Sequence, residues 1–204
     1  MISAVFPLFW AIFFPNALDL YWERNPGTTF NVFHEMSISV AEGVSAGTFD
    51  LGFCSMVEKK DDLVFIPITY QELIVIVQKE HPLACKDSIQ LSDLKDYTLT
   101  TYRDTIPIGK TIRVLLKEKG VDAAYSYDDE ISIAGRISKS GRAAIVADTP
   151  FLKQFDNLKK IRLTDVPKDY PHDLHGLQQK ELYHLRCGGV CEISLVANCL
   201  NLPQ

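Results

Sequence analysis

The sequence predicts an α/β protein with mainly parallel sheets and with helices on both faces of those sheets. Short apolar runs alternate along the chain with amphipathic stretches, which is the pattern of β-α-β units. Several of these runs are apolar throughout, as strands buried on both faces are. With 204 residues, the chain is long enough for one large domain or for two lobes of about 100 residues each.

The predicted strands are short runs of apolar and β-branched residues bounded by turn-forming residues. They cover residues 28–33, 49–53, 63–68, 73–77, 98–102 and 143–147.

Three predicted helices place apolar side chains at helical spacing ahead of a glycine that ends the pattern. These groups are Leu18, Tyr21 and Trp22 before Gly27, Ile112, Leu115 and Leu116 before Gly120, and Ile133, Ala134 and Ile137 before Gly141.

The composition is that of a packed protein and excludes some classes of function. Hydrophobic residues make up 47% and charged residues 23% of the chain, outside the range of disordered sequences. A net charge of -5 argues against the whole chain being a nucleic-acid binder, because phosphate neutralisation needs clustered Lys and Arg. The five cysteines form no disulfide framework. We therefore expect a reducing, cytoplasmic location.

The apolar opening of the chain does not predict a leader or a membrane anchor. It has no Lys or Arg before the apolar run, and Pro7 and Pro15 interrupt it. It is also shorter than the roughly 20 apolar residues that a membrane helix needs. We expect no association with a membrane.

Three motifs occur in an order that resembles the effector-binding domain of LysR-type transcriptional regulators. They read FFPNALDLYWERNPG at 13–27, VAEGVSAGTFDLGFCS at 40–55 and LVFIPITYQELIVIVQKEHPLA at 63–84. Further on, SIQLSDLKDYTLTTY and ISKSGRAAIVADTP are similar to the start of the second lobe and to one of its later strands. The resemblance covers most of residues 10–165.

The resemblance implies a two-lobed fold of the periplasmic-binding-protein-like type 2 class, with two crossover strands. Lobe one would comprise 1–77 plus 158–204, and lobe two would comprise 78–157. It also implies that the protein binds a small-molecule effector in the cleft between the lobes and forms a homodimer or tetramer. DNA would be contacted only through an N-terminal domain that is absent from this sequence, since the chain shows no helix-turn-helix of its own.

Ligands of such folds lie at the carboxyl ends of the strands, where helix N-termini present free N–H groups to an anion. On lobe one this points to Ser37 and Ser39, which could instead be simple helix N-caps, and to Cys54 and Ser55 after a predicted strand. A lone cysteine such as Cys54 is more often buried packing than a reactive thiol.

On lobe two the same reasoning selects Thr100, Thr101, Gly109 and Ala147. The threonines end a predicted strand and could be ordinary strand residues. Gly109 could offer a bare amide or simply start a helix after Pro107. We expect a small carboxylate as effector, and no cofactor, metal site or catalytic residue.

The first strand departs from the family pattern, because a Ser or Thr that holds the effector is expected where the chain reads Phe6-Pro7-Leu8-Phe9. Either the ligand is less polar at this end, or this stretch is not the family's native start. His81, in the His-Pro-Leu-Ala motif, is expected to act in a structural turn rather than to bind a ligand.

The tail also departs from the family, which has a strand and a final helix there. The spacing of His184, Cys187 and Cys191 matches no zinc module, although a metal site is one interpretation. Codons can be chosen for residues from His172 onward such that the second reading frame encodes TTFMVYNKKNYITCGVEAFVKFLW and then a stop, a string similar to the missing ending. We therefore interpret 173–204 as a non-native tail produced by a single-nucleotide shift, leaving lobe one short of a strand and a helix.

Two other classes of function remain as alternatives. A solute-binding protein of a transporter would share the fold but would deliver a solute for transport instead of regulating transcription. An enzyme on this scaffold ranks third, because no paired carboxylates, Ser-His-Asp set or phosphate loop emerges and fold resemblance cannot supply catalysis.

Overall fold

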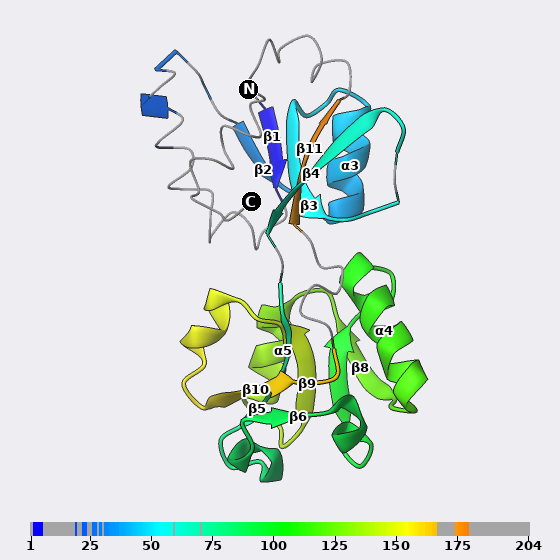
Figure 1. Ribbon diagram of the computed structural model, residues 1–204. Helices are drawn as coiled ribbons and strands as arrows, with labels where there is room; N and C mark the ends of the chain where they lie inside the picture. The colour runs from blue at the N-terminus through cyan, green and yellow to red at the C-terminus, as the bar shows by residue number, and fades with distance from the viewer. Residues whose placement is uncertain are drawn as a thin grey trace. The chain divides into compact units, whose positions relative to one another are not determined.

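The computed structural model divides the chain into two compact α/β units (Figure 1). Unit one comprises Met1–Tyr70 and Asp173–Gln204, and unit two comprises Gln71–His172. The residues that the structure describes are 2–5, 19, 22–23, 26–27, 29, 31–58, 60–69, 71–166 and 174–179.

Unit one is built on a five-stranded sheet, sheet A, with the strand order β2-β1-β3-β11-β4. Strand β1 lies between β2 and β3 and pairs in parallel with both, whereas β11 pairs antiparallel with both β3 and β4. The strands of sheet A are β1 (Ile2–Val5), β2 (Asn31–His34), β3 (Leu51–Ser55), β4 (Leu63–Thr69) and β11 (Leu174–Gln179).

Strand β11 is a correction to what the sequence led us to expect of lobe one. We expected this lobe to lack a strand after residue 172, but residues Leu174–Gln179 complete sheet A between β3 and β4. Leu177 of this strand is fully buried and belongs to the core of unit one. We also expected the family's final helix to be missing, and its place, residues 180–204, lies outside the described residues.

Helix α3 (Ser37–Ser45) packs against sheet A through one apolar face. Val40, Ala41 and Val44 are buried at helical spacing and contact Cys54, Leu63 and Leu177 of the sheet. The helix connects β2 to β3, so it begins at the edge of the sheet where the parallel strands end.

Unit two contains a six-stranded sheet, sheet B, with the strand order β6-β10-β5-β9-β7-β8. The strands β9, β7 and β8 run parallel, while β5 runs antiparallel to β9 and to β10. The strands of sheet B are β5 (Leu73–Gln78), β6 (Ser88–Ile89), β7 (Leu99–Tyr102), β8 (Ala123–Tyr127), β9 (Ala143–Ala147) and β10 (Leu158–Leu163).

Among the described residues of unit two, two α-helices and three short 3-10 helices accompany sheet B. The predicted apolar faces are confirmed, because Ile112, Leu115 and Leu116 of α4 and Ile133, Ala134 and Ile137 of α5 are all buried in one core. Helix α4 ends at Gly120, whose φ of 64° is a left-handed conformation that glycine adopts at little cost. The helices of unit two are η1 (Pro82–Cys85), η2 (Leu91–Leu94), α4 (Pro107–Lys119), α5 (Glu130–Ile137) and η3 (Pro150–Gln154).

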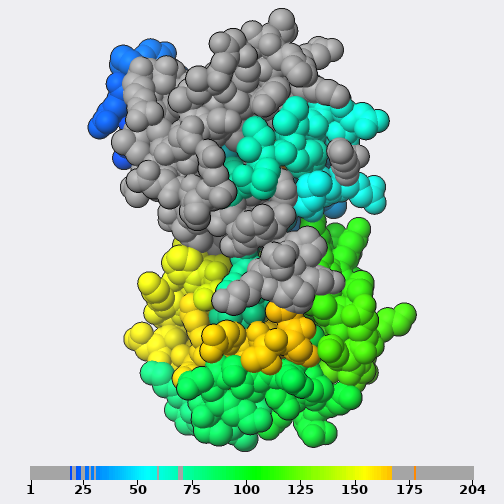
Figure 2. Space-filling view, in the orientation of Figure 1, coloured from blue at the N-terminus to red at the C-terminus, as the bar shows by residue number. Residues whose placement is uncertain are grey.

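Strand β10 lies at the surface of unit two, beside the green segment that contains η1 and β6 (Figure 2). Its side chains alternate accordingly, with Ile161 and Leu163 buried and Arg162 exposed. We expected the lobe boundaries at residues 77 and 158, which lie near the end of β5 and at the start of β10. Both strands instead belong to unit two, since they pair with each other inside sheet B.

The six predicted strands correspond to β2, β3, β4, β5, β7 and β9, with ends that differ by a few residues. Of the helix predicted before Gly27, the structure describes Asp19, Trp22 and Glu23 as helical. The stretch Phe6-Pro7-Leu8-Phe9 and the tail residues His184, Cys187 and Cys191 lie outside the described residues.

Candidate functional site

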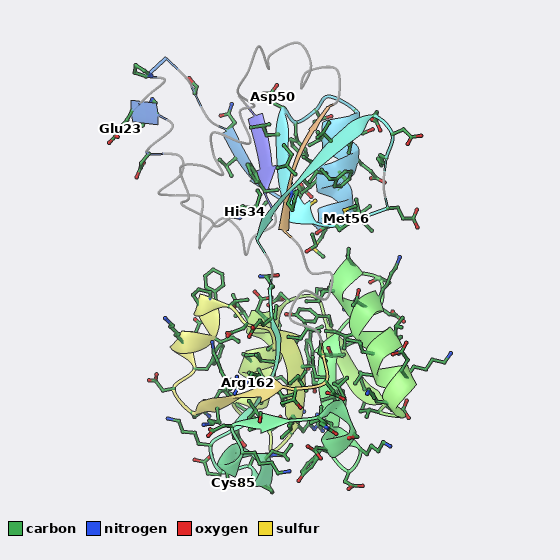
Figure 3. All side chains as sticks on the ribbon, viewed as in Figure 1. Glu23, His34, Asp50, Met56, Cys85 and Arg162 are labelled. Atoms are coloured by element: carbon green, nitrogen blue, oxygen red, sulfur yellow. The ribbon has the colours of Figure 1, made fainter. Side chains whose placement is uncertain are left out.

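The carboxyl edge of sheet A brings together the ends of its parallel strands and the start of α3. His34 ends β2 and Met56 follows β3, and both lie at this edge, whereas Asp50, which precedes β3, lies at the opposite edge (Figure 3). Side chains and amides at this edge are the candidate effector-contacting groups of unit one.

Ser37 and Ser39 lie in the first turn of α3 rather than at its N-cap. The N-cap is Met36, and no side chain caps the helix. The interpretation of these serines as N-caps is therefore wrong. Ser37 is buried and Ser39 is exposed. The first N–H groups of α3 have no acceptor within the helix, so this turn can donate to an anion.

Cys54 and Ser55 are the last two residues of β3. Cys54 is fully buried, and burial raises the pKa of its thiol to about 12. A thiol that burial keeps neutral packs in the core and does not act as a nucleophile. Ser55, partly exposed at the end of the strand, stays a candidate contact.

The two threonines of β7 point to opposite faces of sheet B, as successive strand residues do. Thr101 is buried, and its hydroxyl donates to the carbonyl oxygen of Ile145 at 3.0 Å. This hydroxyl is therefore already used in a bond between β7 and β9. Thr100 is fully buried, and its Oγ1 has no hydrogen-bond partner within the described part of the chain.

Gly109 is the third residue of α4, where its helix passes very close to the end of β7. A Cβ on Gly109 would lie 1.9 Å from the carbonyl oxygen of Arg103. Packing alone therefore explains why this residue is a glycine. Helix α4 nevertheless begins without a side-chain cap, so its first-turn N–H groups can also donate to a ligand.

Ala147 ends β9, and its backbone N–H donates to the hydroxyl oxygen of Tyr102 at 3.0 Å. The Tyr102 hydroxyl lies 3.4 Å from Oε2 of Glu130, to which it donates. Burial, followed by the charge of Glu130, raises the pKa of Tyr102 well above its ordinary value, and burial raises the pKa of Glu130. The amide of Ala147 is thus occupied by the protein itself.

Sequence reasoning missed this buried pair of Tyr102 and Glu130. In the sequence, Glu130 has the pattern of an ordinary acidic residue in the first turn of a helix. Tyr102 has the pattern of an ordinary strand residue. A signal was present, because Asp129 followed by Glu130 and Ser132 is typical of a helix start, and helix starts lie at the carboxyl edges of such sheets.

Helix α5 differs from α3 and α4 because the side chain of its N-cap residue, Asp129, caps it. Asp129 accepts hydrogen bonds from the N–H and the hydroxyl of Ser132, each at 2.7 Å. Three basic side chains near this edge also have carboxylate partners. They are Arg103 with Asp128 at 3.0 Å, Arg113 with Asp104 at 3.3 Å and Lys160 with Asp148 at 2.5 Å.

His81 has the structural role that we expected. It is the N-cap of η1, and its Nδ1 accepts a hydrogen bond from the N–H of Leu83 at 3.1 Å. Burial lowers the pKa of His81, which favours the neutral imidazole that can accept this bond.

Within the described residues, no group of three or more His, Cys, Asp or Glu side chains is placed to hold a metal ion. In the same part of the chain, no helix is both long and apolar enough to cross a membrane.

The two units, each with an α/β sheet whose carboxyl edge receives helix N-termini, have the architecture of periplasmic-binding-protein-like domains. Residues 4–128 match the LysR substrate binding domain family. The chain therefore belongs to the LysR substrate-binding domain family.

Curated relatives of the chain are helix-turn-helix transcriptional regulators. YwbI of Bacillus subtilis is 32% identical over 106 residues, which is 52% of this chain and 35% of the relative. YtlI of the same organism is 30% identical over 179 residues, which is 85% of this chain and 56% of the relative. The chain thus spans roughly a third to a half of the length of these regulators.

Solved structures of the same fold cover nearly the whole chain. The effector-binding domain of QuiR in complex with shikimate has a TM-score of 0.81 at 23% identity, covering 98% of this chain and 94% of that one. The BenM effector-binding domain with benzoate has a TM-score of 0.78 at 14% identity, covering 98% and 89%. HinK, a LysR family regulator from Pseudomonas aeruginosa, has a TM-score of 0.81 at 15% identity, covering 98% and 68%.

Proposed function

We propose that this chain is the effector-sensing part of a LysR-type transcriptional regulator and that it binds a small carboxylate. The observation that carries the proposal is the uncapped start of α3, at the carboxyl edge of sheet A, in a chain of the LysR substrate-binding family. Uncapped N–H groups at the positive end of a helix favour an anion. The uncapped start of α4 offers the same chemistry on unit two.

The contrast with α5 supports this assignment. The carboxylate of Asp129 already occupies the first turn of α5, so an anionic ligand would be repelled there. Three basic side chains near this edge, Arg103, Arg113 and Lys160, are already paired with carboxylates. Recognition of a ligand carboxylate therefore rests on the first-turn amides of α3 and α4, with Ser37, Ser39 and Ser55 as hydroxyl contacts.

Thr101, Cys54 and Ala147 are less suited to contact the effector directly, because their polar groups are buried or already bonded. We keep them as residues that hold the edge in place.

Regulation of transcription follows if the effector binds one arrangement of the regulator better than another, since a ligand shifts only an equilibrium between states that it distinguishes. DNA contact would belong to a helix-turn-helix segment like that of the curated relatives. We further propose a homodimer or tetramer in the cytoplasm. Family membership favours this regulatory role over the transporter solute-binding alternative and over an enzyme.

A thermal-shift screen tests the proposal, because a ligand that binds only the native state raises the melting temperature. Benzoate and shikimate are suitable first probes, with benzyl alcohol as the uncharged match to benzoate. We expect a saturable, concentration-dependent rise with at least one carboxylate and none with the alcohol. The absence of any rise across a broad panel of small carboxylates would contradict the proposal.

A further inference from the structure

The guanidinium of Arg142 lies on the ring of Tyr125, although the two residues belong to strands that are not neighbours. Its Cζ is 4.2 Å from the ring centroid, and Nη2 donates to the Tyr125 hydroxyl at 3.3 Å. Arg142 immediately precedes β9, Tyr125 lies on β8, and β7 separates these strands. The side chain of Arg142 therefore crosses β7.

Two polar groups in the turn before β9 are buried and unsatisfied. Nη1 of Arg142 and the hydroxyl of Ser140 have no hydrogen-bond partner in the part of the chain that the structure describes. Burying part of a charged group without an acceptor is costly, and more so than for a neutral group. Both groups can donate a hydrogen bond, so each needs an acceptor.

A third unsatisfied hydroxyl lies on the strand that Arg142 crosses. Thr100 of β7 pairs in register with Tyr125 on one side and with Ala144 on the other. Paired residues of neighbouring strands present their side chains to the same face, so Thr100 faces the side along which Arg142 runs. Thr100 is 0% exposed and its Oγ1 lacks a partner among the described residues.

The chain segment that contains this turn is positively charged. No acidic residue occurs from Ile131 to Ala147, whereas Arg136, Lys139 and Arg142 do. Arg136 and Lys139 are exposed. In a chain of net charge -5, this segment is a local exception.

We propose that Arg142, Ser140 and Thr100 form a binding site for a small oxyanion at the amino end of β9. The guanidinium supplies two N–H donors in a planar fork that matches an oxyanion, and the two hydroxyls supply further donors. The site lies at the start of β9, whereas the effector-contacting edge of unit two lies where β9 ends. The assignment therefore moves Thr100 from the effector edge to this second site and does not depend on the effector proposal.

Calorimetric titration of the 204-residue chain with inorganic phosphate at constant ionic strength tests the site. We expect saturable binding of one phosphate here, weakened about tenfold or more by R142Q and also by R142K, because an ammonium lacks the planar fork. T100V should weaken binding less. The matched control R136Q changes an exposed cation of α5 nearby and should leave the affinity within about twofold, since an exposed charge contributes little. A parallel titration with acetate separates a phosphate site from a carboxylate site.

Amide chemical-shift mapping gives a second measurement that does not depend on the variants folding. We expect phosphate to move the resonances of residues 138–142 and of Tyr125. Non-saturable heats, equal weakening by R136Q and R142Q, or shifts confined to the first turn of α3 would each overturn the proposal. A crystal grown in phosphate that shows only an ordered water on Nη1 of Arg142 would also overturn it.

Discussion

The hydroxyl of Tyr102 accepts the backbone N–H of Ala147 at 3.0 Å and thereby joins the end of β7 to the end of β9. Both residues are buried. Y102F would leave this N–H and the carboxyl of Glu130 without their partner, so we expect unfolding to become about 1–3 kcal/mol easier. Urea denaturation measures the change. Y127F, on the neighbouring strand, is the control and should change stability by less than about 0.5 kcal/mol; equal effects of the two substitutions would contradict this role.

Glu130 should make stability depend on pH with a defined sign. Burial raises its pKa in the folded protein above that of the unfolded chain. The folded state therefore holds its proton more tightly, so this stabilisation is complete below the unfolded pKa and is lost as pH rises through the folded pKa. We expect E130Q to flatten this part of the stability profile. The hydrogen bond to Lys159 lowers the pKa of Asp87, so the contribution of Asp87 to stability should have the opposite pH dependence. This contribution should be lost as pH falls through the pKa of the folded state.

Gly109 and Gly135 form a matched pair of helix glycines. A Cβ on Gly109 would meet the carbonyl oxygen of Arg103 at 1.9 Å, whereas a Cβ on Gly135 would meet only Phe155 at 4.0 Å. G109A should therefore destabilise by roughly 1–3 kcal/mol through overpacking. G135A should stabilise by up to about 1 kcal/mol through helix propensity. Thermal melts of both variants would refute this if G109A proved as stable as G135A.

The sequence predicted strands best where their residues are buried on both faces. β5 and β9 are apolar runs that sit inside sheet B, and both were identified within one residue of their ends. The sequence did not predict β8 because AAYSY is an exposed edge strand with little apolar pattern. The sequence did not predict β11 because LHGLQQ has the composition of a loop. This segment is a strand because it pairs with β3 and β4 in sheet A.

The candidate site was predicted to the level of strand ends and helix starts, but not to the level of individual side chains. Nothing in a sequence shows that the hydroxyl of Thr101 bonds to Ile145 while that of Thr100 does not. Likewise, the pair of Tyr102 and Glu130 joins residues from two elements whose contact is made only by the fold.

Met36 offers a way to block the first turn of α3 without destabilising it. It is the N-cap of this helix and is exposed, and it makes no side-chain cap. M36D would supply a carboxylate cap, so we expect it to stabilise the protein by about 0.5–1 kcal/mol. A urea titration would contradict this expectation if M36D were less stable than the natural chain.

D129A at the start of α5 is the complementary variant. It removes the two bonds that Asp129 accepts from Ser132 and should cost about 1 kcal/mol of stability. Because α5 is not assigned to the ligand carboxylate, D129A should leave effector affinity nearly unchanged. If the effector carboxylate instead lay at the first turn of α5, removing the carboxylate of Asp129 would strengthen its binding, so a clear gain of affinity in D129A would contradict the assignment to α3.

The most direct test of the effector account is therefore the dissociation constant of the best carboxylate from the screen, measured by calorimetry for the natural chain and for M36D. A carboxylate held by the first-turn amides of α3 must compete with the new aspartate, so the account predicts binding weakened about tenfold or more in a variant that is at least as stable. Equal affinity in the two proteins would contradict the assignment of the effector carboxylate to α3.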